Sequence, residues 1–254
     1  MITKAMLLIV VYSIIDFGDA LPVFNTSMQT VKQIPLPDGY ERVPVQENGF
    51  GAYLRNLPLR KDKRIYLYNG QLKSNQSLHY AVVDISTGNK DLQQCADAIM
   101  RLRAEYFYAR QAYDSIIFRK NDHGFYQFTE YARGNGKPAR ESFMRFMETV
   151  FINCGTYSLQ EQLKPVKNPK DLQVGDVWIK GGAPGHAEIV VDMAVNRLTG
   201  KKLFLLAEGY MPAQDIHILL NPKDASLGPW YELDEAAQLV TATWIFSKNE
   251  LRRW

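Results

Sequence analysis

Residues 172–217 constrain the fold of this chain most strongly. They contain successive apolar, β-branched runs that are separated by glycine, proline or a turn. These runs cover residues 172–179, 186–192, 203–208 and 212–217. Runs of this length and composition are typical of β-strands. We therefore predict consecutive antiparallel strands of one sheet.

His186 opens the second of these runs, directly after the glycine-rich bend at residues 181–185. The first residue of a strand lies at the rim of a sheet, where the backbone is held firmly while the side chain can reach a ligand. This placement suits a histidine that acts as a base.

The clearest predicted helix covers residues 91–113. Asp91 and Gln94 resemble a capping box, and apolar residues follow at helical spacing. These apolar positions are Leu92, Cys95, Ile99, Leu102 and Tyr106. Cys95 therefore lies within the first two turns, where partial positive charge favours a thiolate.

Cys95 and His186 together suggest nucleophilic catalysis, because a neighbouring imidazole can take the proton of a thiol. A third polar group usually orients the imidazole, and Glu208 on the next predicted strand is the first candidate. Gln214 and Asp215 are further ring-orienting candidates. Backbone N–H groups near Cys95, or the side chain of Gln94, are candidates for stabilising an oxyanion.

Arg101 and His217 are the candidates for contacting a substrate. Arg101 belongs to a cluster with Arg103 and Glu105, which either forms salt bridges on a solvated helix face or binds an anionic group. His217 also has a structural alternative. The spacing of the histidines and carboxylates matches no common metal site, so we expect no metal and no cofactor.

The two cysteines leave alternatives open. Cys95 lies on an apolar helix face and could be an inert core residue, or it could form a disulfide with Cys154. Cys154 is a rival nucleophile, but it follows the predicted helix at residues 140–153. Partial negative charge at the C-terminus of a helix disfavours a thiolate.

The first twenty residues predict a secretory signal peptide, because Lys4 precedes an apolar run and small residues follow at positions 18–20. An uncleaved anchor is the alternative. No later stretch is long and apolar enough to span a membrane. The net charge of +3 is spread along the chain, which does not favour nucleic-acid binding. We expect an exported protein of the periplasm or cell envelope.

Two strands carry a resemblance to a known family. Residues 172–177, with Gly175 and Asp176, and residues 185–191, with Gly185 and His186, resemble the paired strands of NlpC-type papain-like cell-wall hydrolases. The order Cys95, His186, Glu208 matches the order of the catalytic residues in that family. The resemblance implies cleavage of amide bonds in cell-wall peptides without a metal.

Over most of its length the chain is also similar to a bacterial envelope family catalogued as domain of unknown function 4846. Residues 91–98, 184–187 and 210–217 carry this second resemblance, which implies no activity.

We therefore expect an α+β fold of papain-like (NlpC-type) architecture, with an antiparallel sheet packed against the helix that carries Cys95. Residues 21–254 form one domain, with an N-terminal wrap (21–60) and an inserted helical lobe (about 115–167). In the lobe we predict strands at 115–118 and 125–131 and helices at 140–153 and 159–163. The last predicted strand covers 240–246.

The expected activity is thiol-dependent hydrolysis of cell-wall peptides. The alternative is a non-catalytic envelope module of the same fold that binds peptide or glycan. A metal-dependent enzyme is a more distant alternative.

Overall fold

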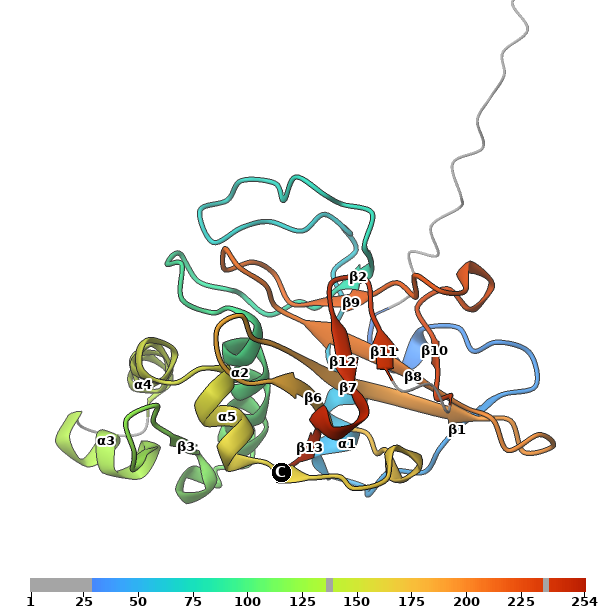
Figure 1. The fold of residues 1–254 in the computed structure, drawn as a ribbon. Coiled ribbons are helices and arrows are strands. Elements are labelled where there is room, and N and C mark those ends of the chain that lie inside the picture. The colour runs from blue at the N-terminus through green and yellow to red at the C-terminus, as the bar shows by residue number, and fades with distance from the viewer. Residues whose placement is uncertain (1–28, 136–138, 235–237) are drawn as a thin grey trace, which may run out of the picture.

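A nine-stranded antiparallel sheet forms the centre of the molecule (Figure 1). The computed structural model describes residues 29–135, 139–234 and 238–254. The strand order is β2–β9–β8–β7–β6–β13–β5, with β1 beside β7 and β10 beside β8. The strands are β1 (Glu41–Arg42), β2 (His79–Val82), β5 (Lys164–Pro165), β6 (Val177–Lys180), β7 (His186–Val195), β8 (Lys202–Glu208), β9 (His217–Leu219), β10 (Tyr231–Glu232) and β13 (Leu251–Arg253). The prediction of consecutive antiparallel strands is confirmed for β6, β7 and β8, although β6 begins only at Val177. The fourth strand, β9, pairs with β8 as expected, but it covers His217–Leu219 and not residues 212–217.

The long strand β7 is buried on both faces, which explains its continuous apolar sequence. Ile189 and Val191 pack in the cluster that contains the helices, whereas Val190 belongs to a second cluster on the opposite side. The register of β7 against β8 shifts between Val190 and Asp192. Both faces of the sheet are therefore covered.

The helices group beside one face of the sheet (Figure 1). They are α1 (Phe50–Arg55), α2 (Cys95–Ala109), α3 (Phe128–Asn135), α4 (Arg140–Asn153) and α5 (Thr156–Gln162). Phe128 and Phe146 from the predicted lobe belong to the same apolar cluster as Ile99 of α2 and Val191 of β7. The core of the lobe is thus continuous with the core of the sheet. No helix of the described ranges has the length and apolar character needed to cross a membrane.

The opposite face is covered by a hairpin of β11 (Gln238–Val240) and β12 (Ile245–Ser247). Phe246 packs on Trp178 of β6, with ring centroids 6.2 Å apart. The prediction of one strand over 240–246 was wrong, because the chain turns between Thr241 and Trp244. The Thr241 hydroxyl accepts a hydrogen bond from the Trp244 amide at 3.0 Å and stabilises that turn.

The helix that carries Cys95 begins later than predicted. Residues 91–94 are not helical, and the helix ends at Ala109 instead of residue 113. The capping box joins Gln94 to Asp97 and not Asp91 to Gln94. The Gln94 amide donates to Asp97 Oδ2 at 3.1 Å. Cys95 is consequently the first residue of α2.

The lobe contains two further differences from the sequence-based expectation. The predicted strand at 125–131 is only β4 (Phe125–Gln127), which pairs with β3 (Ile117–Arg119), and the residues from Phe128 onward form α3, with Phe128 in the core. The helix predicted at 159–163 is α5 and begins earlier, at Thr156, with Gly155 as its N-cap. The helix predicted at 140–153 is confirmed as α4.

Ion pairs with a buried carboxylate join the N-terminal segment to the sheet. Asp192 of β7 is fully buried and pairs with Arg42 at 2.7 Å and with Arg55 of α1. A buried carboxylate requires such partners because it has lost its hydration. The predicted signal peptide, residues 1–20, lies outside the described residues.

Two glycines allow close approaches at the same edge of the sheet. A Cβ on Gly209, directly after β8, would lie 2.9 Å from Ala98 Cβ and 3.0 Å from the Gln94 carbonyl oxygen. A Cβ on Gly185, directly before β7, would collide with the Gly182 carbonyl oxygen and lie 2.6 Å from Thr156 Oγ1. These glycines let the start of α2 and the bend before His186 pack tightly against their neighbours.

We expect Gly185→Ala to lower the free energy of unfolding by about 1–3 kcal/mol, because the new methyl group would be overpacked against backbone atoms. Urea denaturation measures this change. Gly134→Ala is the matched control, since a Cβ there meets no atom within 4 Å. Equal stability of the two variants would contradict the close packing of the bend.

Candidate functional site

Cys95 lies at the N-terminus of α2, in the wall of a pocket of about 530 Å³. The pocket is lined by the start of α2, the end of α4, the bend at 182–185 and the residues after β8. Ile152 and Met211 are exposed apolar side chains in this lining. The first N–H groups of an α-helix have no acceptor within the helix, so the thiol sits where partial positive charge is concentrated.

His186 lines the same pocket and is held in place from several directions. Its Nε2 atom lies 2.6 Å from Glu208 Oε2 on the adjacent strand β8. The imidazole also contacts Tyr210 and Trp244, with ring centroids 5.2 and 5.3 Å away. The bend before it is fixed by α5, because the Gly181 amide donates to the Gln160 side chain at 2.8 Å.

The charges of His186 and Glu208 stabilise each other. Burial by itself lowers the pKa of His186, but interactions with Cys95 and with the two neighbouring glutamates outweigh burial and raise this pKa to about 12. Burial raises the pKa of Glu208, but hydrogen bonds with His186 and His217 outweigh it and lower this pKa to about 2. An imidazolium beside a carboxylate is therefore the favoured state of this pair at neutral pH.

Glu208 also binds a second histidine on the far side. Its Oε1 atom lies 3.1 Å from His217 Nε2, and the other ring nitrogen of His217 lies 2.9 Å from the Asp215 carbonyl oxygen. His79 packs edge-on against His217, with ring centroids 5.8 Å apart. Polar contacts thus run from the pocket across three adjacent strands, β7, β8 and β9.

Glu188 is a site residue that the sequence analysis missed. It is fully buried, its Oε1 atom lies 3.6 Å from His186 Nε2, and burial raises its pKa. Thr241 donates to this oxygen at 2.7 Å, and Thr243 donates to Glu208 at 2.8 Å. The two-residue spacing from His186 along one strand was a usable signal, since it places both side chains on one face.

The residues that could hold a metal ion are His186, Glu188 and Glu208. One ligand atom from each lies within 4.8 Å of the others, and the second carboxylate oxygen of Glu188 has no hydrogen-bond partner among the described residues. A metal ion would have to replace the direct hydrogen bond between His186 and Glu208.

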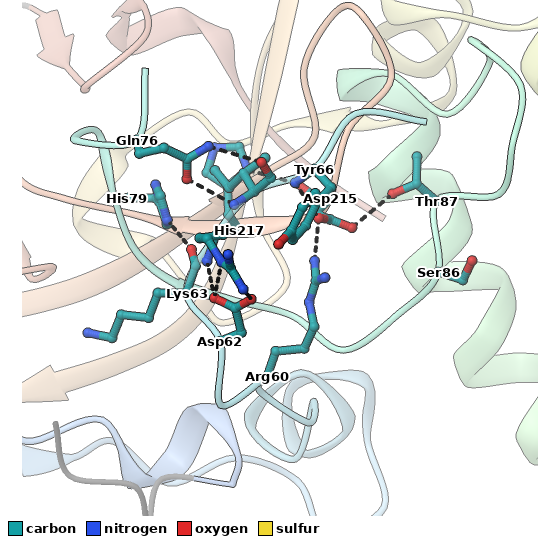
Figure 2. A network of polar contacts seen from close by, with 12 residues as sticks. Arg60, Asp62, Lys63, Tyr66, Gln76, His79, Ser86, Thr87, Asp215 and His217 are labelled. Atoms are coloured by element: carbon teal, nitrogen blue, oxygen red, sulfur yellow. Dashed lines mark hydrogen bonds and ion pairs between the residues drawn. The ribbon is translucent and has the colours of Figure 1, made fainter. Parts of the chain in front are cut away.

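The predicted auxiliary residues do not all meet at the pocket. Gln94 lines it as the N-cap of α2, and its side-chain amide donates to Asp91 at 3.3 Å. Gln214 is buried and is not among the lining residues. Figure 2 shows the Asp215 carboxylate directed toward Arg60 and Tyr66, and it accepts a hydrogen bond from the Tyr66 amide at 2.7 Å.

The two residues predicted to contact substrate are likewise absent from the lining of this pocket. Arg101 is buried and pairs with Glu105 at 2.6 Å, so it forms the salt bridge expected of that cluster, although in the interior and not on a solvated face. His217 is fully buried and supports Glu208.

Both cysteines are free thiols. Cys154 lines the same pocket as Cys95, but burial and the nearby charge of Asp97 raise its pKa to about 12. Of the two cysteines, only Cys95 has an imidazole acting on it.

Asp97 supplies a test of the electrostatics around the pocket. Burial raises its pKa from the ordinary value of 3.8 to about 8. Because the pKa of Asp97 is higher in the folded than in the unfolded protein, ionisation of this carboxyl group lowers the free energy of unfolding. The loss is absent below pH 4 and complete above pH 8. An asparagine at this position cannot ionise, so the free energy of unfolding of Asp97→Asn minus that of wild type should increase by at least about 1 kcal/mol as the pH rises between these limits.

Chemical denaturation at pH 4, 6 and 9 checks this difference. Asp114→Asn, which changes an exposed carboxylate, is the control and should show no such trend. A pH-independent difference for Asp97→Asn would contradict the burial of a poorly solvated carboxyl group.

The comparisons with known proteins assign a family. No curated protein and no solved structure matches the chain. The family described as domain of unknown function (4846) matches residues 30–253, which is nearly all of the described chain. The chain therefore belongs to the family of domain of unknown function (4846).

Proposed function

We propose that this protein is a thiol-dependent hydrolase of amide bonds. One observation carries the proposal: Cys95 is the first residue of a helix in a pocket that it shares with His186, whose imidazole is bound to the buried Glu208. A nucleophile, a base and a group that orients the base are the elements of this chemistry. Each comes from a different rigid element of the fold.

In the proposed reaction Cys95 acts as a thiolate paired with the His186 imidazolium, and its sulfur attacks the carbonyl carbon of the amide. His186 then protonates the leaving nitrogen as the carbon–nitrogen bond breaks, which leaves a thioester on Cys95. Water, deprotonated by His186, hydrolyses the thioester and releases the acid. The Cys95 amide and the Gln94 side chain are the proposed donors to the oxyanion.

Glu208 is proposed as a positioning residue. It fixes the orientation of the imidazole through Nε2 and stabilises its charge, which leaves the other ring nitrogen for Cys95. Its second oxygen is occupied by His217, so Glu208 cannot rotate without breaking another buried hydrogen bond. Thr243 adds a third restraint.

The proposed substrate is a peptide of the bacterial cell wall, and the proposed location is the periplasm or cell envelope. The order of Cys95, His186 and Glu208 in a helix and two adjacent strands supports a papain-like arrangement of the NlpC type. The apolar run in residues 1–20 supports export.

A binding module of the same fold is the competing proposal. It requires neither a reactive thiol nor a base, and a Cys95–Cys154 disulfide would favour it. The free thiols and the imidazole beside Cys95 support the enzyme instead. Zinc analysis of the purified protein tests the metal-dependent alternative at His186, Glu188 and Glu208.

We expect Cys95 to be alkylated by iodoacetamide already at pH 6, because the adjacent imidazolium stabilises the thiolate. Cys154 is the internal control and should react at least about tenfold more slowly, because its thiol has a raised pKa. Peptide mass spectrometry of the native protein from pH 5 to 9 measures both rates. His186→Ala should abolish the reaction of Cys95 at pH 6, and a Cys95 that stays unlabelled in wild type would rule out the mechanism.

We further expect Cys95→Ala to abolish the hydrolysis of murein peptides and Glu208→Gln to lower kcat about 10²-fold, since the imidazole loses its ionic partner. Product formation is followed by chromatography. Glu141→Gln, on an exposed position of α4, is the control for activity. Residual activity in Cys95→Ala equal to wild type would overturn the proposal.

A further inference from the structure

Arg103 of α2 occupies an aromatic cage on a different part of the surface. Its guanidinium carbon lies 4.5 Å from the ring centroid of Phe107, 4.6 Å from that of Phe50 and 5.0 Å from that of Trp254. The ring of Tyr106 is 5.7 Å away. Such rings attract a cation but provide no hydrogen-bond acceptor.

No carboxylate among the described residues forms an ion pair with Arg103. Burial lowers the pKa of Arg103 to about 10. Tyr106, and no carboxylate, is the group whose charge raises this pKa. Its Nε–H group is buried and has no hydrogen-bond partner within the described chain. Arg101, two residues earlier, pairs with Glu105 at 2.6 Å and also donates to Gln93 at 3.2 Å. Arg103 is thus a poorly solvated cation without a counter-charge.

A second unused donor lies beside it. The Trp254 indole Nε1–H is buried and also lacks a partner among the described residues. Arg103 and Trp254 both line a pocket of about 990 Å³, which is separate from the pocket of Cys95. Buried donors without a partner are costly, and both of these belong to residues that line the pocket.

The charged side chains that line this pocket carry a net positive charge. The lining contains four cationic and two acidic side chains, which are Arg103, Lys170, Lys202, Arg253, Asp171 and Asp176. Asp176 is neutralised by Arg253 at 2.7 Å. The carboxylates of the pocket therefore do not compensate Arg103.

We propose that this pocket binds an oxyanion, a carboxylate or a phosphate group, at the Arg103 guanidinium, with the Trp254 indole beside it. A planar guanidinium is well suited to both groups, because its N–H donors match two oxygens at once. The aromatic walls accept an apolar portion of the same ligand. Eight residues separate Arg103 from Cys95, about 12 Å along the helix axis. The pocket and its ligand do not depend on the chemistry proposed for Cys95.

Nuclear magnetic resonance of the tryptophan indole N–H signals tests this proposal. Inorganic phosphate and acetate are titrated separately into the ¹⁵N-labelled protein at constant ionic strength, with chloride as the balancing anion. The signal of Trp254 is assigned with Trp254→Phe. We expect a saturable shift of this signal, whereas the signal of Trp244, which lines the pocket of Cys95, stays in place.

Arg103→Met should weaken the binding at least tenfold, and Arg110→Met is the matched control. Arg110 directly follows the last residue of α2, contacts Tyr106 and binds the Asn48 carbonyl oxygen, but it does not line this pocket. If Arg103→Met fails to fold, Arg103→Lys retains the charge without the planar donors and should still bind more weakly than wild type.

The two titrations show which kind of oxyanion the pocket binds. Saturation with phosphate alone supports a phosphate-bearing ligand, and saturation with acetate supports a carboxylate. The absence of a saturable shift with either anion overturns the proposal. A shift that is undiminished in Arg103→Met or Arg103→Lys overturns it as well.

Discussion

The buried carboxylate of Glu208 is the constraint on which the centre of this structure depends. It is 1% exposed, so its charge is stable only if protein groups replace the lost water. His186 from β7 and His217 from β9 do so from either side, and Thr243 from the covering hairpin adds a hydrogen bond. One side chain thereby fixes the relative positions of three strands and of the hairpin above them.

The helix α2 lines both the pocket of Cys95 and the pocket of Arg103. Its N-terminus reaches the ends of β7 and β8 because Gly209 has no side chain, and Cys95 then shares a pocket with His186. Two turns later Arg103 enters an aromatic cage at a second cavity. The polar groups of α2 thus have different surroundings. Arg101 is buried and pairs with Glu105, whereas Arg103 and Cys95 line two separate pockets.

Much of this arrangement could be predicted from the sequence. The apolar runs gave the order and direction of β6 to β9, and the positions of Cys95, His186 and Glu208 in their elements indicated a common site. The errors arose where packing overrides local preference. Residues from Phe128 onward form a helix in which Phe128 packs in the core. The chain turns near Thr241, and this turn brings Phe246 into contact with Trp178. Glu188 was missed because a glutamate on a strand is ordinarily solvated.

Short-range patterns and the order of motifs along the chain were enough to identify the family, the succession of β6 to β9 and the candidate residues Cys95, His186 and Glu208. Which polar groups meet depends on the fold. The folded chain places His217 behind Glu208, directs Asp215 toward Arg60 and leaves Arg103 without an ion-paired carboxylate among the described residues. These arrangements depend on how separate strands and loops pack and on the burial that results, which no local pattern specifies.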